Sequence, residues 1–166
     1  MLALDVGTQS VRALVFNGLG DMLAREQIPI EPYFSEQPGW AEQDADLYWR
    51  AMGEACAALW QTQDPAQING LALTTQRATT VVVDVDGKPL RPAIIWLDQR
   101  RAEQQEPIGG LWGLAFKVVG VADTIAGFQA SAHSNWLAEQ QPELWKNVHK
   151  CLLLSGYLSH QLTGEY

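Results

Sequence analysis

The chain opens on an apolar stretch that is interrupted once, LALDVGTQSVRALVFN over residues 2–17. A first apolar run ends at an aspartate, the chain crosses a glycine and two hydroxyl residues, and a second apolar run follows. Two such runs around a glycine-containing turn predict strands over 2–5 and 11–17. A hairpin needs a turn but does not need these polar side chains, so the loop itself becomes a candidate for function.

The polar residues of this loop are of the types that bind phosphate. Gly7 allows backbone N–H groups to converge on an anion, and Thr8 and Ser10 add hydroxyl donors. Arg12 offers a planar fork that matches phosphate oxygens, and Asp5 could hold Mg²⁺ directly or through water. The alternative is a polar hairpin with a capping aspartate, and spacing alone leaves both interpretations open.

Composition limits the class of protein. The 166 residues are 47% hydrophobic, which suits one compact domain. A net charge of -8 and the lack of a basic cluster disfavour nucleic acid and anionic membrane surfaces as partners. The two cysteines form no CxxC pair, the three histidines share no metal-ligand spacing, and no basic segment precedes the first apolar run. We therefore expect a cytoplasmic protein.

Strands come first along the chain, and helices alternate with strands afterwards. A third strand over 22–30 should pair antiparallel with the second, because only the short glycine-containing segment 18–21 separates them. An aperiodic loop over 31–43 precedes a helix that starts after Asp44. One apolar stripe of that helix consists of Tyr48, Met52, Ala55 and Leu59.

The second half of the chain predicts short strands and several helices. Further strands are expected over 68–73, 79–85, 93–96 and 151–154. Helices are expected over 98–106, 131–140, 143–150 and 156–162, and the segment 109–120 stays ambiguous because glycines interrupt an apolar run. This order of elements predicts an α/β fold with a mixed sheet that is partly parallel.

The loop sequence resembles a known family. Asp5-Val6-Gly7-Thr8, followed by Ser10 and Arg12, is similar to the first phosphate loop of the sugar-kinase/actin superfamily, and more narrowly of the FGGY carbohydrate kinases. These include the xylulose, ribulose and glycerol kinases. Further stretches are similar to the family in the same order, from end to end of the chain: Pro38-Gly39-Trp40 with Glu42-Gln43-Asp44 and Trp49, Gly70-Leu71-Ala72-Leu73 with Gln76, Asp86-Gly87 with Pro89, Pro92-Ala93-Ile94-Ile95-Trp96 with Asp98 and Arg100, and Leu162-Thr163-Gly164-Glu165.

The resemblance implies a fold and a domain organisation. The fold would be a ribonuclease H-like (actin-like ATPase) α/β domain, a mixed sheet flanked by helices and incomplete at its C-terminal end. Residues 1–166 would form part of the N-terminal, sugar-binding domain of an FGGY kinase, without the second, nucleotide-binding domain. The family's catalytic aspartate would lie beyond Tyr166, so no catalytic residue is expected in this chain.

The resemblance also implies roles for individual residues. ATP phosphates would be bound by Gly7, Thr8, Gln9, Ser10 and Arg12, and Mg²⁺ by Asp5. The sugar would be bound by Gln76, Arg77, Trp96 and Asp98. The alternatives are a core tryptophan at Trp96 and a helix N-cap at Asp98. Glycerol kinases carry Gln-Arg-Glu where this chain carries Gln76-Arg77-Ala78, which disfavours glycerol itself.

The implied activity is ATP- and Mg²⁺-dependent phosphorylation of a hydroxyl of a small ketose or polyol. We expect the isolated chain to be inactive, and to form a homodimer or higher association through an apolar sheet face left uncovered. The alternative from another class is a non-catalytic actin-fold remnant that acts as a binding or assembly module. A sugar-sensing regulator that binds DNA is disfavoured by the net charge of -8.

Overall fold

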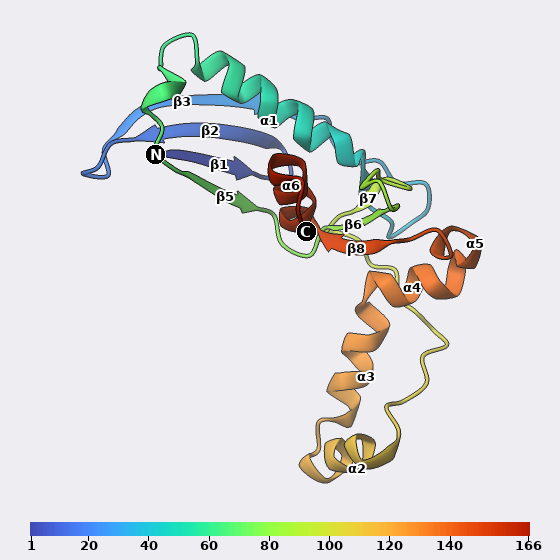
Figure 1. Cartoon of the computed structure of the whole chain (residues 1–166). Coiled ribbons are helices and arrows are strands. Elements are labelled where there is room, and N and C mark those ends of the chain that lie inside the picture. Colours follow the sequence, from blue (N-terminus) through green and yellow to red (C-terminus); the bar gives the residue numbers. More distant parts are fainter.

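The computed structural model describes residues 1–166, which form a body of two sheets from which a helical arm projects (Figure 1). The first sheet has the strand order β3-β2-β1-β5. Its strands are β1 (Leu2–Val6), β2 (Ser10–Phe16), β3 (Met22–Pro29) and β5 (Leu71–Thr75). The first three strands pair antiparallel, and β5 runs parallel to β1. The mixed, partly parallel sheet and the antiparallel second hairpin are therefore confirmed.

Helix α1 (Ala45–Leu59) covers one face of this sheet and packs against β2 and β3. The predicted stripe is the face that it buries, since each of its four residues is at most 3% exposed. The Asp44 carboxylate accepts a hydrogen bond from the backbone N–H of Asp46, so the helix begins where the sequence predicts. The opposing strand residues alternate, and those that face α1 are buried while their neighbours are partly exposed.

The second sheet has the order β4-β7-β6-β8 and is antiparallel. Its strands are β4 (Glu42–Gln43), β7 (Ala93–Ile94), β6 (Thr80–Val83) and β8 (Lys150–Leu153). Helix α6 (Leu154–Thr163) follows β8 and contributes to the same apolar core as α1. The Tyr157 hydroxyl joins the two helices by donating to the Asp46 carboxylate over 2.7 Å.

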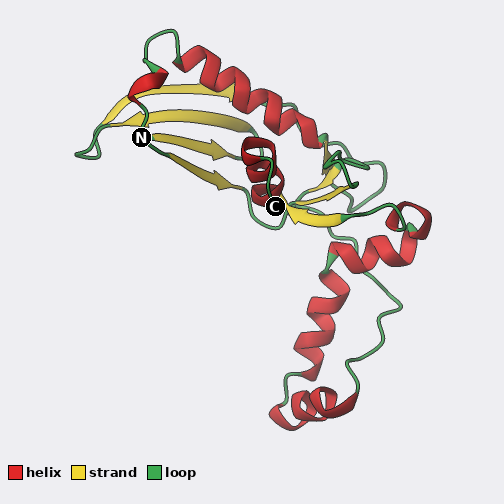
Figure 2. Cartoon of the chain, viewed as in Figure 1, coloured by secondary structure: helices red, strands yellow, loops and turns green.

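The remaining helices follow one another between β7 and β8, and Figure 2 shows the first two extending away from both sheets. They are α2 (Gly110–Val119), α3 (Ala122–Ser131), α4 (His133–Gln140) and α5 (Pro142–Trp145), and a short 3₁₀ turn, η1 (Pro65–Gln67), follows α1. No single helix is long and apolar enough to cross a bilayer. Helices α2 and α3 meet the length and hydropathy criteria only as a pair, and their axes are bent by 118°.

One predicted helix is wrong, because the segment 98–106 is irregular. Its backbone N–H groups bond to distant partners instead of to the preceding turn. Ala102 N–H donates to the Ala130 carbonyl, and Glu103 and Gln104 N–H donate to the Glu139 carboxylate. The predicted loop 31–43 in turn contains the short strand β4, for which no local pattern exists.

Some apolar strand residues are uncovered, as the sequence predicts, since Leu71 on β5 is 47% and Leu153 on β8 is 58% exposed, but the largest exposed run lies outside the sheets. The sheet face opposite α1 carries the charged pair Asp5 and Arg12 beside Ala3 and Leu14, all of them partly exposed. The largest run of exposed apolar side chains is on α2, where Leu111 is 87% and Val118 is 80% exposed. The association of copies stays a prediction, and the arm is now its strongest structural support.

Candidate functional site

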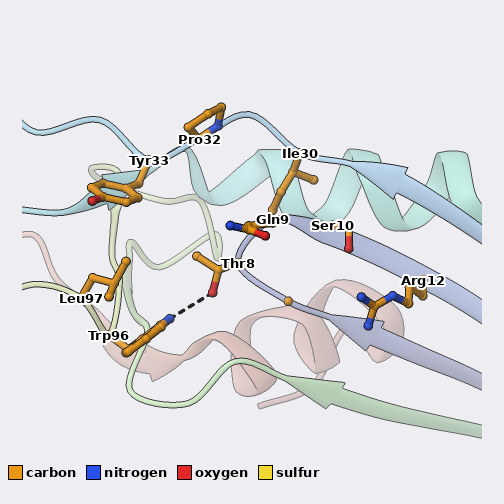
Figure 3. A pocket seen from close by; sticks show the side chains of 10 residues that line it. Thr8, Gln9, Ser10, Arg12, Ile30, Pro32, Tyr33, Trp96 and Leu97 are labelled. Atoms are coloured by element: carbon orange, nitrogen blue, oxygen red, sulfur yellow. Dashed lines mark hydrogen bonds between the residues drawn. The ribbon is translucent and has the colours of Figure 1, made fainter.

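The candidate site is built around the tight β1–β2 loop (Figure 3). Gly7 N–H donates to the Ser10 carbonyl over 3.0 Å, which closes the turn and leaves Thr8 and Gln9 at its tip. A Cβ atom on Gly7 would approach the Ser10 carbonyl oxygen to 3.3 Å, a tight contact that glycine avoids. The loop is therefore a compact turn whose polar tip faces a cavity.

Asp5 and Arg12 lie directly opposite each other on β1 and β2. The Arg12 guanidinium donates to the Asp5 carboxylate over 2.8 Å, and the two side chains are 41% and 38% exposed. An ion pair this exposed contributes little to stability, so either partner can turn to a ligand at small cost. The structure thus places a cation and an acid beside the loop, within reach of solvent.

The Thr8 hydroxyl connects this loop to two distant segments. It accepts a hydrogen bond from the indole N–H of Trp96 over 3.0 Å, drawn as the dashed line in Figure 3. It also donates to the Gln76 Oε1 atom over 2.9 Å. Gln76 follows β5 and Trp96 follows β7, so one hydroxyl brings together residues separated by 68 and 88 positions.

Two hollows adjoin at Trp96. One is a cavity of about 620 Å³ lined by Gly7, Thr8, Gln9, Ser10, Arg12, Ile30, Pro32, Tyr33, Trp96 and Leu97. The other, of about 430 Å³, is lined by Gln76, Arg77, Ala78 and Trp96. Both volumes are in the range of small-molecule sites. Trp96 is 53% exposed, so it forms a wall between the hollows and is not the core tryptophan of the alternative interpretation.

Ala78 is an unusual residue in the second hollow. Its φ angle of 55° lies in the left-handed region, where it is the sole non-glycine residue of the chain. Such backbone conformations cost free energy and concentrate at functional sites. Alanine carries no chemical signal for this conformation, so sequence analysis could not find it.

Asp98 does not line either hollow. Its side chain is fully buried, and its two carboxylate oxygens accept from the Ala41 N–H over 2.7 Å and from three N–H groups of Arg100 at 2.7 to 2.9 Å. The carboxylate holds the turn after Trp96 by accepting backbone hydrogen bonds. This structural role is similar to that of the predicted N-cap, but no helix follows Asp98. Contact between Asp98 and a sugar stays a prediction, to which this geometry lends no support.

A buried ionic cluster holds that turn in place. Arg100 also donates to the Glu42 carboxylate over 2.6 Å, and Arg91 contacts the same oxygen. The Arg100 guanidinium packs against two indole rings that contact each other edge to face, and lies 4.0 Å from the centroid of Trp40 and 4.6 Å from that of Trp136. Burial lowers the pKa of Arg91, and the Glu42 charge opposes that shift. The cluster therefore anchors the segment that carries the Trp96 wall.

The β1–β2 loop, the Trp96 wall and the partly parallel sheet can now be compared with known proteins. Residues 1–166 match the N-terminal domain of the FGGY family of carbohydrate kinases along their whole length. The chain belongs to this family. This match confirms the resemblance seen in the sequence and the ribonuclease H-like α/β fold that it implied. FGGY carbohydrate kinases as a family are phosphotransferases.

Among curated relatives, this FGGY chain is 35% identical to a glycerol kinase of Thermococcus gammatolerans, covering 100% of this chain and 34% of that protein. It is 27% identical to a xylulose kinase of Escherichia coli K12, covering 99% of this chain and 34% of the relative. A crystal structure of a xylulose kinase from Brucella ovis superposes with a TM-score of 0.80 at 25% identity, over 99% of this chain and 34% of that one. The chain thus spans about a third of the length of the relatives it matches.

Proposed function

We propose that the chain is the sugar-binding, N-terminal part of a kinase that transfers a phosphoryl group from ATP to a hydroxyl of a small ketose or polyol. The observation that carries this proposal is the Thr8 hydroxyl, which bonds to both Gln76 and Trp96. Phosphoryl transfer depends on holding donor and acceptor side by side, because positioning and charge stabilisation provide most of the catalysis. A phosphate loop in direct contact with a sugar-sized hollow meets that requirement.

The donor side of the proposed site is the larger cavity. Backbone N–H groups of the loop and the Ser10 hydroxyl would contact phosphate oxygens, and Arg12 would bind them with its planar fork. Mg²⁺ is held in proteins by one or two carboxylates together with phosphate oxygens, so the single, partly exposed carboxylate of Asp5 beside the loop fits that ion. When bound with ATP, Mg²⁺ would neutralise charge on the phosphates.

The acceptor side is the hollow at Gln76, Arg77 and Ala78. The exposed Trp96 ring offers an apolar wall to the carbon face of a sugar, and the Gln76 amide can pair with hydroxyls. The relatives include both glycerol and xylulose kinases, and neither assigns the substrate of this chain. Alanine at position 78 and the room around it favour a ketose or a longer polyol over glycerol.

Ligand titrations followed by tryptophan fluorescence test this function. We expect saturable changes with Mg²⁺ and the non-hydrolysable ATP analogue AMP-PNP, and with at least one of D-xylulose, D-ribulose, a pentitol or glycerol. The changes should be lost in Trp96→Phe, because that ring lines both hollows. They should persist in Trp112→Phe, whose 71% exposed ring lies on α2 outside both hollows. Absence of any saturable change in the wild-type chain contradicts the proposal.

The 166-residue chain should not turn over ATP by itself. No carboxylate lines either hollow, and Asp5 beside the loop is assigned to Mg²⁺, so no residue of the proposed site is left to accept the proton of a substrate hydroxyl. We propose that the missing base lies later in the first domain and that a second domain holds most of the adenosine site, both within the two thirds of the relatives' length outside this sequence. A coupled assay for ADP release should give no steady rate with any sugar. A steady rate abolished by Asp5→Asn would contradict this expectation.

The same lack of an acid favours a second candidate function. A chain that binds ligands in these hollows and has no catalytic base could serve as a binding or assembly module. Saturable ligand binding together with a companion polypeptide that carries the acid favours the kinase, whereas binding without any such companion favours the module. The homodimer and the cytoplasmic location expected from the sequence stay predictions.

A further inference from the structure

Two polar side chains lie buried beneath the site and have no assigned role. Tyr48 on α1 is 0% exposed, and Gln43 on β4 is 1% exposed. Tyr48 belongs to the apolar core cluster under the first sheet. Polar atoms in such a core cost free energy unless each finds a hydrogen-bond partner, so we expect both side chains to be fully paired.

Their hydrogen bonds form a closed ring through the site. The Gln76 Nε2 amide donates to the Tyr48 hydroxyl over 2.7 Å, and that hydroxyl donates to Gln43 Oε1. The Gln43 Nε2 amide donates to the Glu31 carbonyl over 2.8 Å and to the Thr8 carbonyl over 3.3 Å. The ring closes where the Thr8 hydroxyl donates to Gln76 Oε1.

The ring determines which way each proton points. Because the Tyr48 hydroxyl already donates to Gln43, it can only accept from Gln76. The amide of Gln76 must therefore turn its nitrogen to Tyr48 and its oxygen to Thr8. Burial raises the pKa of Tyr48 far above its ordinary value, which keeps the phenol protonated and able to donate.

We propose that Tyr48 and Gln43 are positioning residues that fix the Gln76 amide and, through it, the direction of the Thr8 hydroxyl proton. A consequence rests on the proposed function. Phosphate oxygens only accept hydrogen bonds. A phosphate that binds the Thr8 hydroxyl must therefore replace Gln76 Oε1 as the acceptor of the hydrogen bond that this hydroxyl donates. The freed Gln76 Oε1 can then accept from a substrate hydroxyl, while Tyr48 keeps the amide in place. Phosphate binding and sugar binding are thereby coupled through the direction of the Thr8 hydroxyl hydrogen bond.

The positioning role is tested without ligand, by NMR of the 166-residue chain. The signals to follow are the Trp96 indole N–H, assigned with Trp96→Phe, and the side-chain amide of Gln76. In Tyr48→Phe the amide loses its acceptor, so both signals should move, the indole toward its solvent-exposed position. Tyr157→Phe is the matched control, since Tyr157 is likewise buried, at 1% exposed, and donates to Asp46 outside the ring. It should leave both signals in place.

A second variant guards against a failure of Tyr48→Phe to fold. Gln43→Met removes the acceptor of the Tyr48 hydroxyl and the donor to the Thr8 carbonyl, and should move the same two signals. The proposal is overturned if the folded ring variants leave the Trp96 and Gln76 signals unmoved, or if Tyr157→Phe moves them equally.

A last arm separates this proposal from the proposed function. Magnesium pyrophosphate added to the wild-type chain should shift the Gln76 amide, and Tyr48→Phe should weaken its binding about fivefold, the effect of one hydrogen bond. If the ring variants behave as expected and pyrophosphate has no effect, then the positioning role stands and the phosphate site fails. If pyrophosphate binds and the ring variants are silent, then the positioning role fails alone.

Discussion

Arg100→Leu should lower the free energy of unfolding by about 3–5 kcal/mol, the typical cost of removing one partner from a buried ion pair. The side chain is 2% exposed and donates to the carboxylates of Asp98 and Glu42, which are 0% and 4% exposed. Without the guanidinium, Asp98 keeps only backbone donors and Glu42 keeps only Arg91. Two buried negative charges would then be poorly compensated, and Trp40 and Trp136 would lose the guanidinium that packs against both rings.

Urea unfolding followed by circular dichroism measures this loss. Arg50→Ala is the matched control, because Arg50 also pairs with a carboxylate, that of Asp44, but both side chains are 56% exposed. Its removal should leave the unfolding midpoint nearly unchanged, since exposed ion pairs contribute little. Equal midpoints for Arg100→Leu and the wild-type chain would show that the cluster does not anchor the turn at Trp96.

Arg12→Leu should weaken the binding of Mg²⁺·AMP-PNP about 10- to 100-fold, since a hydrogen bond to a charged group contributes about 1.5–3 kcal/mol. Arg12 is the one guanidinium that lines the larger cavity, and its pairing with Asp5 keeps it on the open face of the sheet. Loss of the fork would remove the proposed bidentate contact with phosphate, and no other guanidinium lines the cavity to replace it. Isothermal titration of the two chains measures the ratio of dissociation constants.

Arg25→Leu is the control for charge alone. Arg25 lies on the adjacent strand β3, is exposed, and lines neither hollow. Arg25→Leu removes the same unit of charge from the same sheet as Arg12→Leu does. Its effect on the dissociation constant of Mg²⁺·AMP-PNP should be small and should disappear at high salt. An equal loss in both variants would mean that Arg12 acts through the general field of the protein and not by contact with phosphate.

Local patterns in the sequence were sufficient for much of this fold. The apolar runs on either side of the loop predict β1 and β2, because alternation and a glycine turn act within a few residues. The stripe on α1 and the cap at Asp44 are equally local, and both are confirmed. The helix expected over 98–106 does not form, because the conformation of this segment depends on long-range contacts. Its N–H groups pair with Ala130 and Glu139 far along the chain.

The sequence by itself determined the β1–β2 loop, the partly parallel sheet and membership of a kinase family, because these depend on local patterns, on the order of the elements along the chain and on sequence motifs, respectively. Only the tertiary structure decided which motif residues face a ligand. Trp96 and Asp98 are two positions apart, yet Trp96 is 53% exposed and the Asp98 carboxylate is fully buried against Arg100. By its spacing Tyr48 is one more member of an apolar stripe, but its hydroxyl accepts a hydrogen bond from Gln76, 28 positions away. Contacts between distant segments set burial and hydrogen-bond direction, and no local pattern encodes them.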